Sequence, residues 1–236
     1  MDKSFAHVVF DWNGTLIDDV DLAVEAVNAV LSAAGLRRIT RRIYRARFRF
    51  PIQDFYRALG FTFADVPFAR VIGDYLAVFD TRVHECPLHA GALELIEAAR
   101  DAAISVSILS ASHHAILGRT LRHHRLEHHF AHVMGLDHEH APGKREQAVM
   151  LGRRIGVEPE RVLYIGDTTH DADIARELGW AGLLVANGHQ SAAVLSRAGC
   201  LMADDLPTIR ARVIGAVETE ASRRPARGCS GGERRQ

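Results

Sequence analysis

Short apolar runs alternate with amphipathic helical patterns along most of this chain, and the alternation limits its fold more than any other feature. Runs rich in Val, Ile, Leu and Phe are typical of strands that are buried on both faces of a sheet. Helical segments between such strands predict parallel pairing through right-handed crossovers. We therefore expect an α/β fold with a doubly wound parallel sheet. The expected strands are Phe5–Phe10, Ile104–Leu109, Phe130–Met134, Val162–Ile165, Gly182–Ala186 and Gly199–Met202.

The chain between the first two expected strands does not follow this alternation of strands and helices. Its apolar residues recur at helical spacing, and no convincing strand pattern is present. About 70 residues of helix are too many for a simple crossover, so we predict that residues 17–87 form an inserted helical cap domain. The helices expected there are Asp21–Ala34, Arg41–Phe48, Ile52–Leu59 and Phe68–Val83.

The remaining segments define the expected core domain and a tail. Residues 1–16 and 88–217 carry the strands, with helices expected at Ala90–Ala102, Arg145–Ile155 and Ala172–Leu178. The segment 218–236 is rich in Arg, Gly, Ser and Glu and almost free of apolar residues, so we expect it to be disordered.

Composition excludes several classes of protein. The formal net charge is zero, which provides no general attraction to nucleic acid or to an anionic membrane. No apolar stretch approaches the roughly 18 residues of a membrane-spanning helix. The three cysteines show neither a disulfide framework nor metal-ligand spacing, and the first strand follows Met1 too closely to leave room for a signal peptide. We expect a cytoplasmic monomer or homodimer without nucleic-acid or membrane partners.

Polar residues follow three of the expected strands. Asp11 comes directly after the first strand, Ser110 after the second, and Asp167 just after Val162–Ile165. Open α/β sheets bind their ligands at the carboxyl ends of the strands, so this edge is the expected site. Asp11 lies on a sharp turn at that edge, which is a suitable position for a carboxylate nucleophile.

Four segments, in this order, resemble the four motifs of the haloacid dehalogenase-like hydrolases. Asp11-Trp12-Asn13-Gly14-Thr15 resembles the family's Asp-x-Asp-Gly-Thr, and Ser107–Ser112 resembles a second motif that ends in Ser or Thr. Gly143-Lys144 fits the lone Lys of the third motif, and Gly166–Asp171 fits Gly-Asp-x-x-x-Asp. The resemblance spans about Ala6 to Leu206. It implies a Rossmann-like core with a helical cap and a phosphoric monoester hydrolase that uses Mg²⁺.

The resemblance also implies a role for each motif residue. Asp11 would attack phosphorus and form an aspartyl-phosphate. The positive charge of Lys144 would stabilise both the Asp11 carboxylate and the phosphoryl group that is transferred. Asp171 would either reach the metal through water or hold Lys144. The implied metal ligands are Asp11, Asp167, Asp171 and the main-chain carbonyl of Asn13. The implied phosphate ligands are Lys144, Thr15, Ser110 and the N–H of Ala111.

Asn13 departs from the family pattern. The usual Asp there acts as acid and base, whereas an amide has no titratable proton and forgoes help typically worth ~10²–10⁴-fold. Three alternatives remain: a leaving group that needs little protonation, a proton from His170 or from the cap, or a catalytically weakened protein. The segment Ile17–Pro87 contains no lysine, which argues against the Schiff-base chemistry of phosphonoacetaldehyde hydrolases. We expect Asn13→Asp to leave the fold intact and to retain or increase hydrolysis.

The cap sequence suggests the kind of substrate. Arginines interleave with Phe48, Phe50 and Phe55, and the run Phe48–Tyr56 resembles the cap of phosphoglycolate phosphatase-like members. We predict that Arg47 and Arg49 bind a second anionic group of a small phosphorylated metabolite. The expected function is a Mg²⁺-dependent phosphatase that hydrolyses a small organic phosphate monoester through an aspartyl-phosphate. The alternative is a weakened homologue that binds a phosphorylated ligand or partner.

Overall fold

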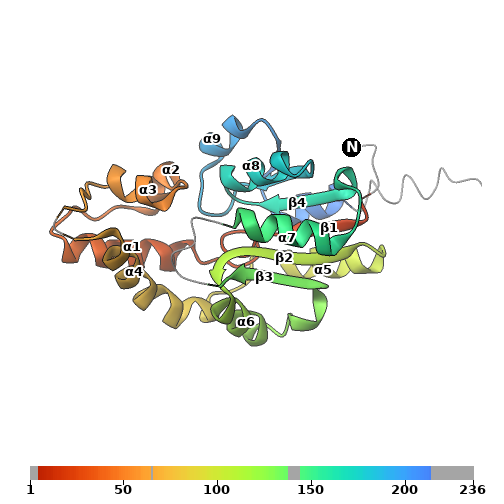
Figure 1. Cartoon of the computed structure of the whole chain (residues 1–236), viewed down its shortest axis with the longest axis horizontal. Coiled ribbons are helices and arrows are strands. Elements are labelled where there is room, and N and C mark those ends of the chain that lie inside the picture. The colour runs from red at the N-terminus through yellow and green to blue at the C-terminus, as the bar shows by residue number, and fades with distance from the viewer. Residues whose placement is uncertain (1–4, 65, 138–143, 214–236) are drawn as a thin grey trace, which may run out of the picture.

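A six-stranded parallel sheet forms the centre of the protein, which confirms the expected α/β class. The computed structural model describes residues 5–64, 66–137 and 144–213. The spatial order of the strands is β3-β2-β1-β4-β5-β6, and Figure 1 labels the first four of them. The strands are β1 (His7–Phe10), β2 (Ser105–His113), β3 (His132–Leu136), β4 (Val162–Gly166), β5 (Ala181–Val185) and β6 (Leu201–Ala203).

The strand order places a topological switch point at the carboxyl end of β1. From β1 the chain runs outward through β2 and β3, and it then returns to pair β4 with the other side of β1. Crossovers that leave in opposite directions open a crevice between adjacent strand ends, which is where sheets of this kind bind ligands. Every residue of β1 and β4 is buried, as expected for the two central strands.

Helices cover the sheet, and four more lie together to one side of it (Figure 1). None of the helices in the described ranges is long and apolar enough to cross a membrane. The helices around the sheet are α5 (Ala92–Asp101), α6 (His114–His123), α7 (Arg145–Ile155), α8 (Thr169–Glu177) and α9 (Ala192–Leu195), and residues 206–213 are also helical. Short 3₁₀ turns are η1 (Val83–Glu85), η2 (Glu127–His129), η3 (Pro159–Arg161) and η4 (Ser196–Ala198).

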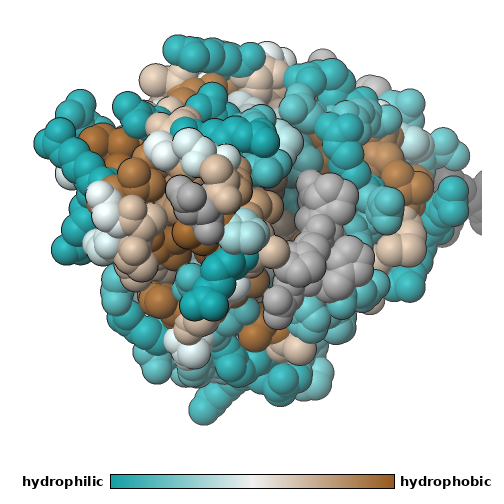
Figure 2. Space-filling view, turned by 60° about the vertical axis from the view of Figure 1, so that its left-hand side comes forward, coloured by the Kyte–Doolittle hydropathy of each residue, from teal (hydrophilic) through white to brown (hydrophobic). Residues whose placement is uncertain are grey.

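The α1–α4 segment occupies the part of the chain that was predicted to be an inserted cap. The two segments that connect it to the sheet run side by side. They are joined by hydrogen bonds from the Asp18 N–H to the Pro87 carbonyl (2.8 Å) and from the His89 N–H to the Leu16 carbonyl (2.9 Å). Its surface, which comes forward in Figure 2, carries apolar side chains bordered by hydrophilic ones. The helices are α1 (Val20–Ala33), α2 (Arg41–Arg47), α3 (Ile52–Ala58) and α4 (Phe68–Arg82). The domain limits stay predictions, and the tail 218–236 lies outside the described residues.

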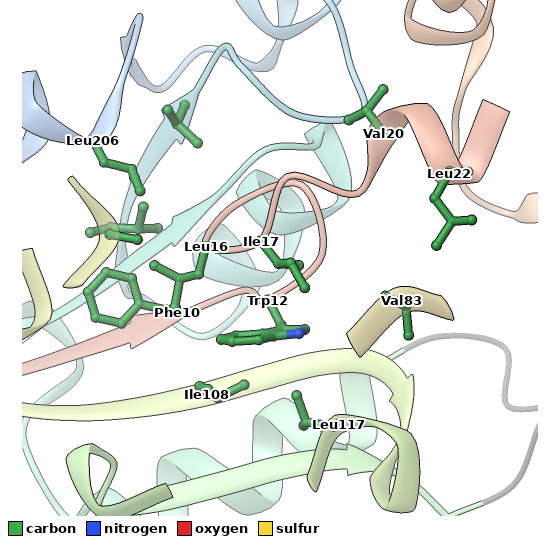
Figure 3. Close-up of a cluster of buried hydrophobic side chains, with 14 of the residues drawn as sticks. Phe10, Trp12, Leu16, Ile17, Val20, Leu22, Val83, Ile108, Leu117 and Leu206 are labelled. Atoms are coloured by element: carbon green, nitrogen blue, oxygen red, sulfur yellow. The ribbon is translucent and has the colours of Figure 1, made fainter. Parts of the chain in front are cut away.

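Trp12 anchors the turn that follows β1. Its indole is 1% exposed and lies between this turn and Ile108 of β2, in a cluster with Phe10, Leu16 and Ile17 (Figure 3). Burial of this large side chain fixes the path of the turn. The flanking residues Asp11 and Asn13 therefore have a rigid support at the sheet edge.

Two differences from the sequence expectation bear on the site. β2 continues to His113, with an irregular register against β3 after Leu109, so Ser110 lies within the strand rather than at its end. α8 begins at Thr169 instead of Ala172. A capping box supplies the physical reason, since the Asp171 carboxylate accepts from the Thr168 N–H (2.9 Å) and from its hydroxyl (2.7 Å).

His7 predicts an acid-sensitive fold. Its side chain is 3% exposed and bonded to the Ser107 hydroxyl (2.9 Å), and burial together with nearby His132 lowers its pKa from 6.5 to about 4. The unfolded chain therefore takes up a proton more readily, and stability falls as the pH drops from about 6.5 towards 4. At pH 5 the loss reaches about 2 kcal/mol relative to neutral pH.

The measurement is urea unfolding of the wild type and of His7→Gln at pH 7 and pH 5. The variant keeps a polar group but cannot titrate, so it should lose about 2 kcal/mol less between the two pH values. Equal losses in the two proteins would show that His7 does not carry the effect.

Candidate active site

Three buried carboxylates meet at the switch point. Asp11 follows β1, Asp167 follows β4, and Asp171 lies in the first turn of α8. Each offers an oxygen within 4.8 Å of the others, and their exposed fractions are 6%, 0% and 2%. The structure thus brings together the acids that sequence reasoning placed at one sheet edge.

Lys144 lies among these carboxylates. Its Nζ is paired with the Asp11 carboxylate and lies 2.8 Å from Asp171 Oδ1, and it also donates to the Leu109 carbonyl (3.3 Å). Burial alone would lower the pKa of this ammonium group, but Asp11 and Asp171 outweigh burial and raise it. Lys144 therefore remains charged in a site that excludes water.

Asp171 uses both of its oxygens for protein contacts. Oδ1 accepts from Lys144 and from the Tyr164 hydroxyl (2.9 Å), while Oδ2 accepts from the Thr168 N–H and hydroxyl. Burial would raise the pKa of Asp171, but Lys144 and these hydrogen bonds lower it. A Cβ at Gly166 would overlap the Asp171 carboxyl group, so the motif needs a glycine there. Of the two roles expected for Asp171, these contacts favour holding Lys144.

Asp11 and Asp167 have a donor set that fits a hard divalent cation. Their oxygens Asp11 Oδ2 and Asp167 Oδ1 lie 3.4 and 3.3 Å from the hydroxyl of Thr15, which is fully buried. Burial raises the pKa of Asp11 well above its usual range and that of Asp167 to about 6, and Lys144 offsets this only in part at Asp11. Mg²⁺ prefers carboxylate oxygens and would supply the missing positive charge.

The Asn13 side chain is hydrogen-bonded to three polar side chains. Its Oδ1 accepts from the Ser112 hydroxyl (2.6 Å) and from the buried Ser110 hydroxyl (3.4 Å), and its Nδ2 donates to Asp19 Oδ2 (2.7 Å). Ser110 also accepts from the Ser112 N–H (3.0 Å), whereas Ala111 between them is half-buried. The predicted phosphate ligands Ser110 and Ala111 therefore lie beside the turn that carries Asp11.

Asp19 and His189 belong to the site, although sequence reasoning did not identify them. His189 Nε2 lies 3.2 Å from Asp19 Oδ1, and the His189 N–H donates to Asp167 Oδ2. Burial lowers the pKa of His189, but Asp19 and the other nearby carboxylates outweigh it and raise the pKa to about 9. The signal in the sequence is weak: Gly188 and His189 follow β5 at the active edge. A Cβ at Gly188 would overlap the Asp167 carboxylate, so only glycine fits.

Helix α2 is fastened to the loop that carries His189. The Arg45 guanidinium donates to the carbonyls of Ala186 (2.5 Å), Gly188 (2.7 Å) and Gln190 (3.1 Å). Three further contacts join the same parts: Tyr44 Oη lies 2.9 Å from His189 Nδ1, Gln190 Nε2 donates to the Phe48 carbonyl, and the Ser191 N–H donates to the Arg45 carbonyl. The α1–α4 segment therefore covers one side of the carboxylate cluster.

Arg47 and Arg49 are placed differently from Arg45. Both are exposed, and Arg47 donates to the Ala58 carbonyl (3.2 Å). Neither has a described contact with the Asp11 cluster, so their role in substrate binding stays a prediction. His170 stacks on Phe50, with ring centroids 4.6 Å apart, and burial lowers its pKa.

Comparison with known proteins assigns the family. A model described as haloacid dehalogenase-like hydrolase matches residues 8–185, so the chain belongs to that family of hydrolases. It is 26% identical over 186 residues to a probable phosphatase, IndB, of Dickeya dadantii, covering 77% of this chain and 81% of that protein. It is 25% identical over 185 residues to a phosphoglycolate phosphatase of Synechococcus elongatus, covering 77% and 84%.

Solved structures share the fold. A haloacid dehalogenase-like family hydrolase of Streptococcus pneumoniae superposes with a TM-score of 0.75 at 18% identity, covering 88% of this chain and 98% of that one. CbbY of Rhodobacter sphaeroides, solved in complex with phosphate, gives a TM-score of 0.65 at 19% identity, covering 86% and 95%. At identities of 18% and 19%, these comparisons show a shared fold.

The carboxylate cluster predicts stabilisation by Mg²⁺. A cation bound only by the folded state raises the melting temperature, and saturating Mg²⁺ should raise that of the wild type by about 5 °C or more. Asp167→Asn should lose most of this shift. Asp173→Asn is the matched control, because Asp173 is an exposed acid of α8 that pairs with Arg176. A shift of wild-type size in Asp167→Asn would contradict the assignment.

The contacts of Arg45 predict that it orders the loop after β5. Arg45→Met removes its side-chain hydrogen bonds, so amide hydrogens of residues 187–190 should exchange about tenfold faster or more. Arg42→Met is the control, since Arg42 is an exposed residue of the same helix. Mass spectrometry of deuterium uptake measures the change, and equal protection in both variants would argue against the Arg45 anchor.

Proposed function

We propose that this protein is a Mg²⁺-dependent phosphatase that hydrolyses a small organic phosphate monoester through an aspartyl-phosphate at Asp11. The observation that carries the proposal is the environment of Asp11: one carboxylate oxygen is paired with Lys144, and the other faces Asp167 across the Thr15 hydroxyl. Such an arrangement fixes a nucleophile and supplies positive charge where phosphoryl oxygens would lie.

The proposed reaction has two steps, formation of the aspartyl-phosphate and its hydrolysis. In the first, an Asp11 oxygen bonds to phosphorus as the ester P–O bond breaks, and the leaving group departs as an alkoxide that takes its proton from water, because Asn13 has none to give. In the second, water attacks phosphorus and releases phosphate and the Asp11 carboxylate. Lys144, Ser110, Thr15 and the Ala111 N–H would hold the equatorial oxygens in both steps. Bound Mg²⁺, held by Asp11, Asp167 and the Asn13 carbonyl, would neutralise charge between carboxylate and phosphate.

The relatives support the same reaction class. Two of them are named as phosphatases, and one of these names phosphoglycolate, a small organic phosphate. We infer a small phosphorylated metabolite as substrate for this chain too, with Arg47 and Arg49 as candidate ligands of a second anionic group. A cytoplasmic monomer or homodimer remains our expectation.

One observation favours the second candidate, a weakened homologue that binds a phosphorylated ligand or partner. Asn13 carries no titratable proton, and its amide is engaged by Asp19 and Ser112. The retained Asp11, Lys144 and Asp167 favour catalysis, because a binding protein does not need a nucleophile.

Phosphate release with Mg²⁺ tests the proposal. The panel should include an aryl phosphate and a set of small phosphate esters. Asp11→Asn should lower release by about 10³-fold or more, because the amide cannot attack phosphorus. Asp173→Asn should keep wild-type activity, and melting curves should show that both variants fold. Absence of wild-type release above the Asp11→Asn background on every ester would instead support the binding protein.

A further inference from the structure

Asp19 is a fully buried acid that does not perform its local structural task. It occupies the N-cap position of α1, where an aspartate usually accepts from the first N–H groups of its helix. Its side chain makes no capping bond. The carboxylate is turned towards the active site, and helix α1 forgoes a contact that is typically worth about 1 kcal/mol.

The Asp19 oxygens bind three groups of the site. Oδ2 accepts from Asn13 Nδ2 (2.7 Å), and Oδ1 accepts from the Gly14 N–H (2.8 Å) and faces His189 Nε2 at 3.2 Å. Asp19 therefore joins the turn that carries the nucleophile to the loop that contacts Asp167. Asp18, next to it, is 40% exposed and lies near Arg41 instead.

These contacts fix which way the Asn13 amide points. A carboxylate accepts hydrogen bonds only, so Nδ2 of Asn13 must face Asp19. The amide oxygen then faces Ser112 and Ser110, whose hydroxyls donate to it. An aspartate at position 13 would instead place a second carboxylate oxygen about 2.7 Å from that of the buried Asp19.

We propose that Asp19 is a positioning residue of the active site, which holds the Asn13 side chain and the Gly14 turn beside Asp11 and makes an amide at position 13 a requirement. The proposal deepens the proposed phosphatase function and rests on it for its catalytic part. The Asn13–Asp19 pair is thus one unit in which the acid stands at position 19 and the amide at position 13. Asn13→Asp alone, which the sequence led us to expect to be harmless, should damage the site.

The transposed pair is the decisive variant. In Asn13→Asp/Asp19→Asn, the amide oxygen introduced at position 19 can accept from Gly14 and His189, and the NH₂ group there can donate to the new carboxylate at position 13. Asp19→Asn alone sets two NH₂ groups against each other, and Asn13→Asp alone sets two carboxylates against each other. Each single change therefore leaves buried polar groups without partners, whereas the double change restores every hydrogen bond.

Melting curves of the four proteins test the pairing without any substrate. Each single variant should melt about 4 °C or more below the wild type, and the transposed variant should recover most of that loss. Asp18→Asn is the matched control and should melt close to the wild type. If Asp19 served only as a helix cap, Asp19→Asn would be neutral, because Asn caps as well as Asp. That outcome, or additive losses in the double variant, would overturn the proposal.

Hydrolysis of an aryl phosphate with Mg²⁺ tests the positioning role. Each single variant should lose about tenfold or more in kcat with a smaller change in KM, and the transposed variant should regain kcat. Recovery of the melting temperature without recovery of kcat would refute positioning and leave a structural pair. If the wild type itself releases no phosphate above Asp11→Asn, the proposed function fails, while the melting curves still decide the pairing.

Discussion

The ion pairs of Lys144 are the interaction on which the site depends. Asp11, Asp167 and Asp171 are buried within 4.8 Å of one another, and carboxylates so placed repel one another and resist ionisation. Lys144 pairs with Asp11 and Asp171, and its removal would leave buried charges uncompensated. Asp167 is paired with the His189 N–H instead, so the remaining charge lies between Asp11 and Asp167. A divalent cation between Asp11 and Asp167, as proposed above, would balance this charge.

The fold and the motif residues were within reach of sequence reasoning because they depend on local signals. Continuous apolar runs marked β1 and β4, which are buried throughout, and polar residues after each strand marked the active edge. Ends of elements were less predictable. β2 continues past Leu109 to His113 because it still pairs with β3 there, after a shift in register. The end of β2 therefore depends on a strand that lies later in the sequence.

Asp19 and His189 could not be found in this way, because their roles arise from contacts across the fold. Asp19 lies two residues before the predicted start of a helix, and only the structure shows that it is the N-cap residue and that its side chain makes no capping bond. His189 lies far along the chain, after the fifth strand, yet its Nε2 is 3.2 Å from Asp19 Oδ1. The arginines of the α2 region could not be told apart from the sequence either. Five of them lie between Arg41 and Arg49, and only the structure shows that Arg45 donates to the 186–190 loop.

The contacts of α2 link access to the site with its internal geometry. Arg45 and Tyr44 bind the loop after β5, and in the same loop the His189 N–H donates to Asp167 and Gly188 packs against its carboxylate. Helix α2 and Asp167 therefore contact one common loop. Movement of the α1–α4 segment away from the sheet would break these bonds and release the loop from α2. Asp11 is buried in this arrangement, and low solvent exposure strengthens the charge interactions around it. Any displacement of α2 that admitted water would therefore weaken the pairing of Lys144 with Asp11 and Asp171.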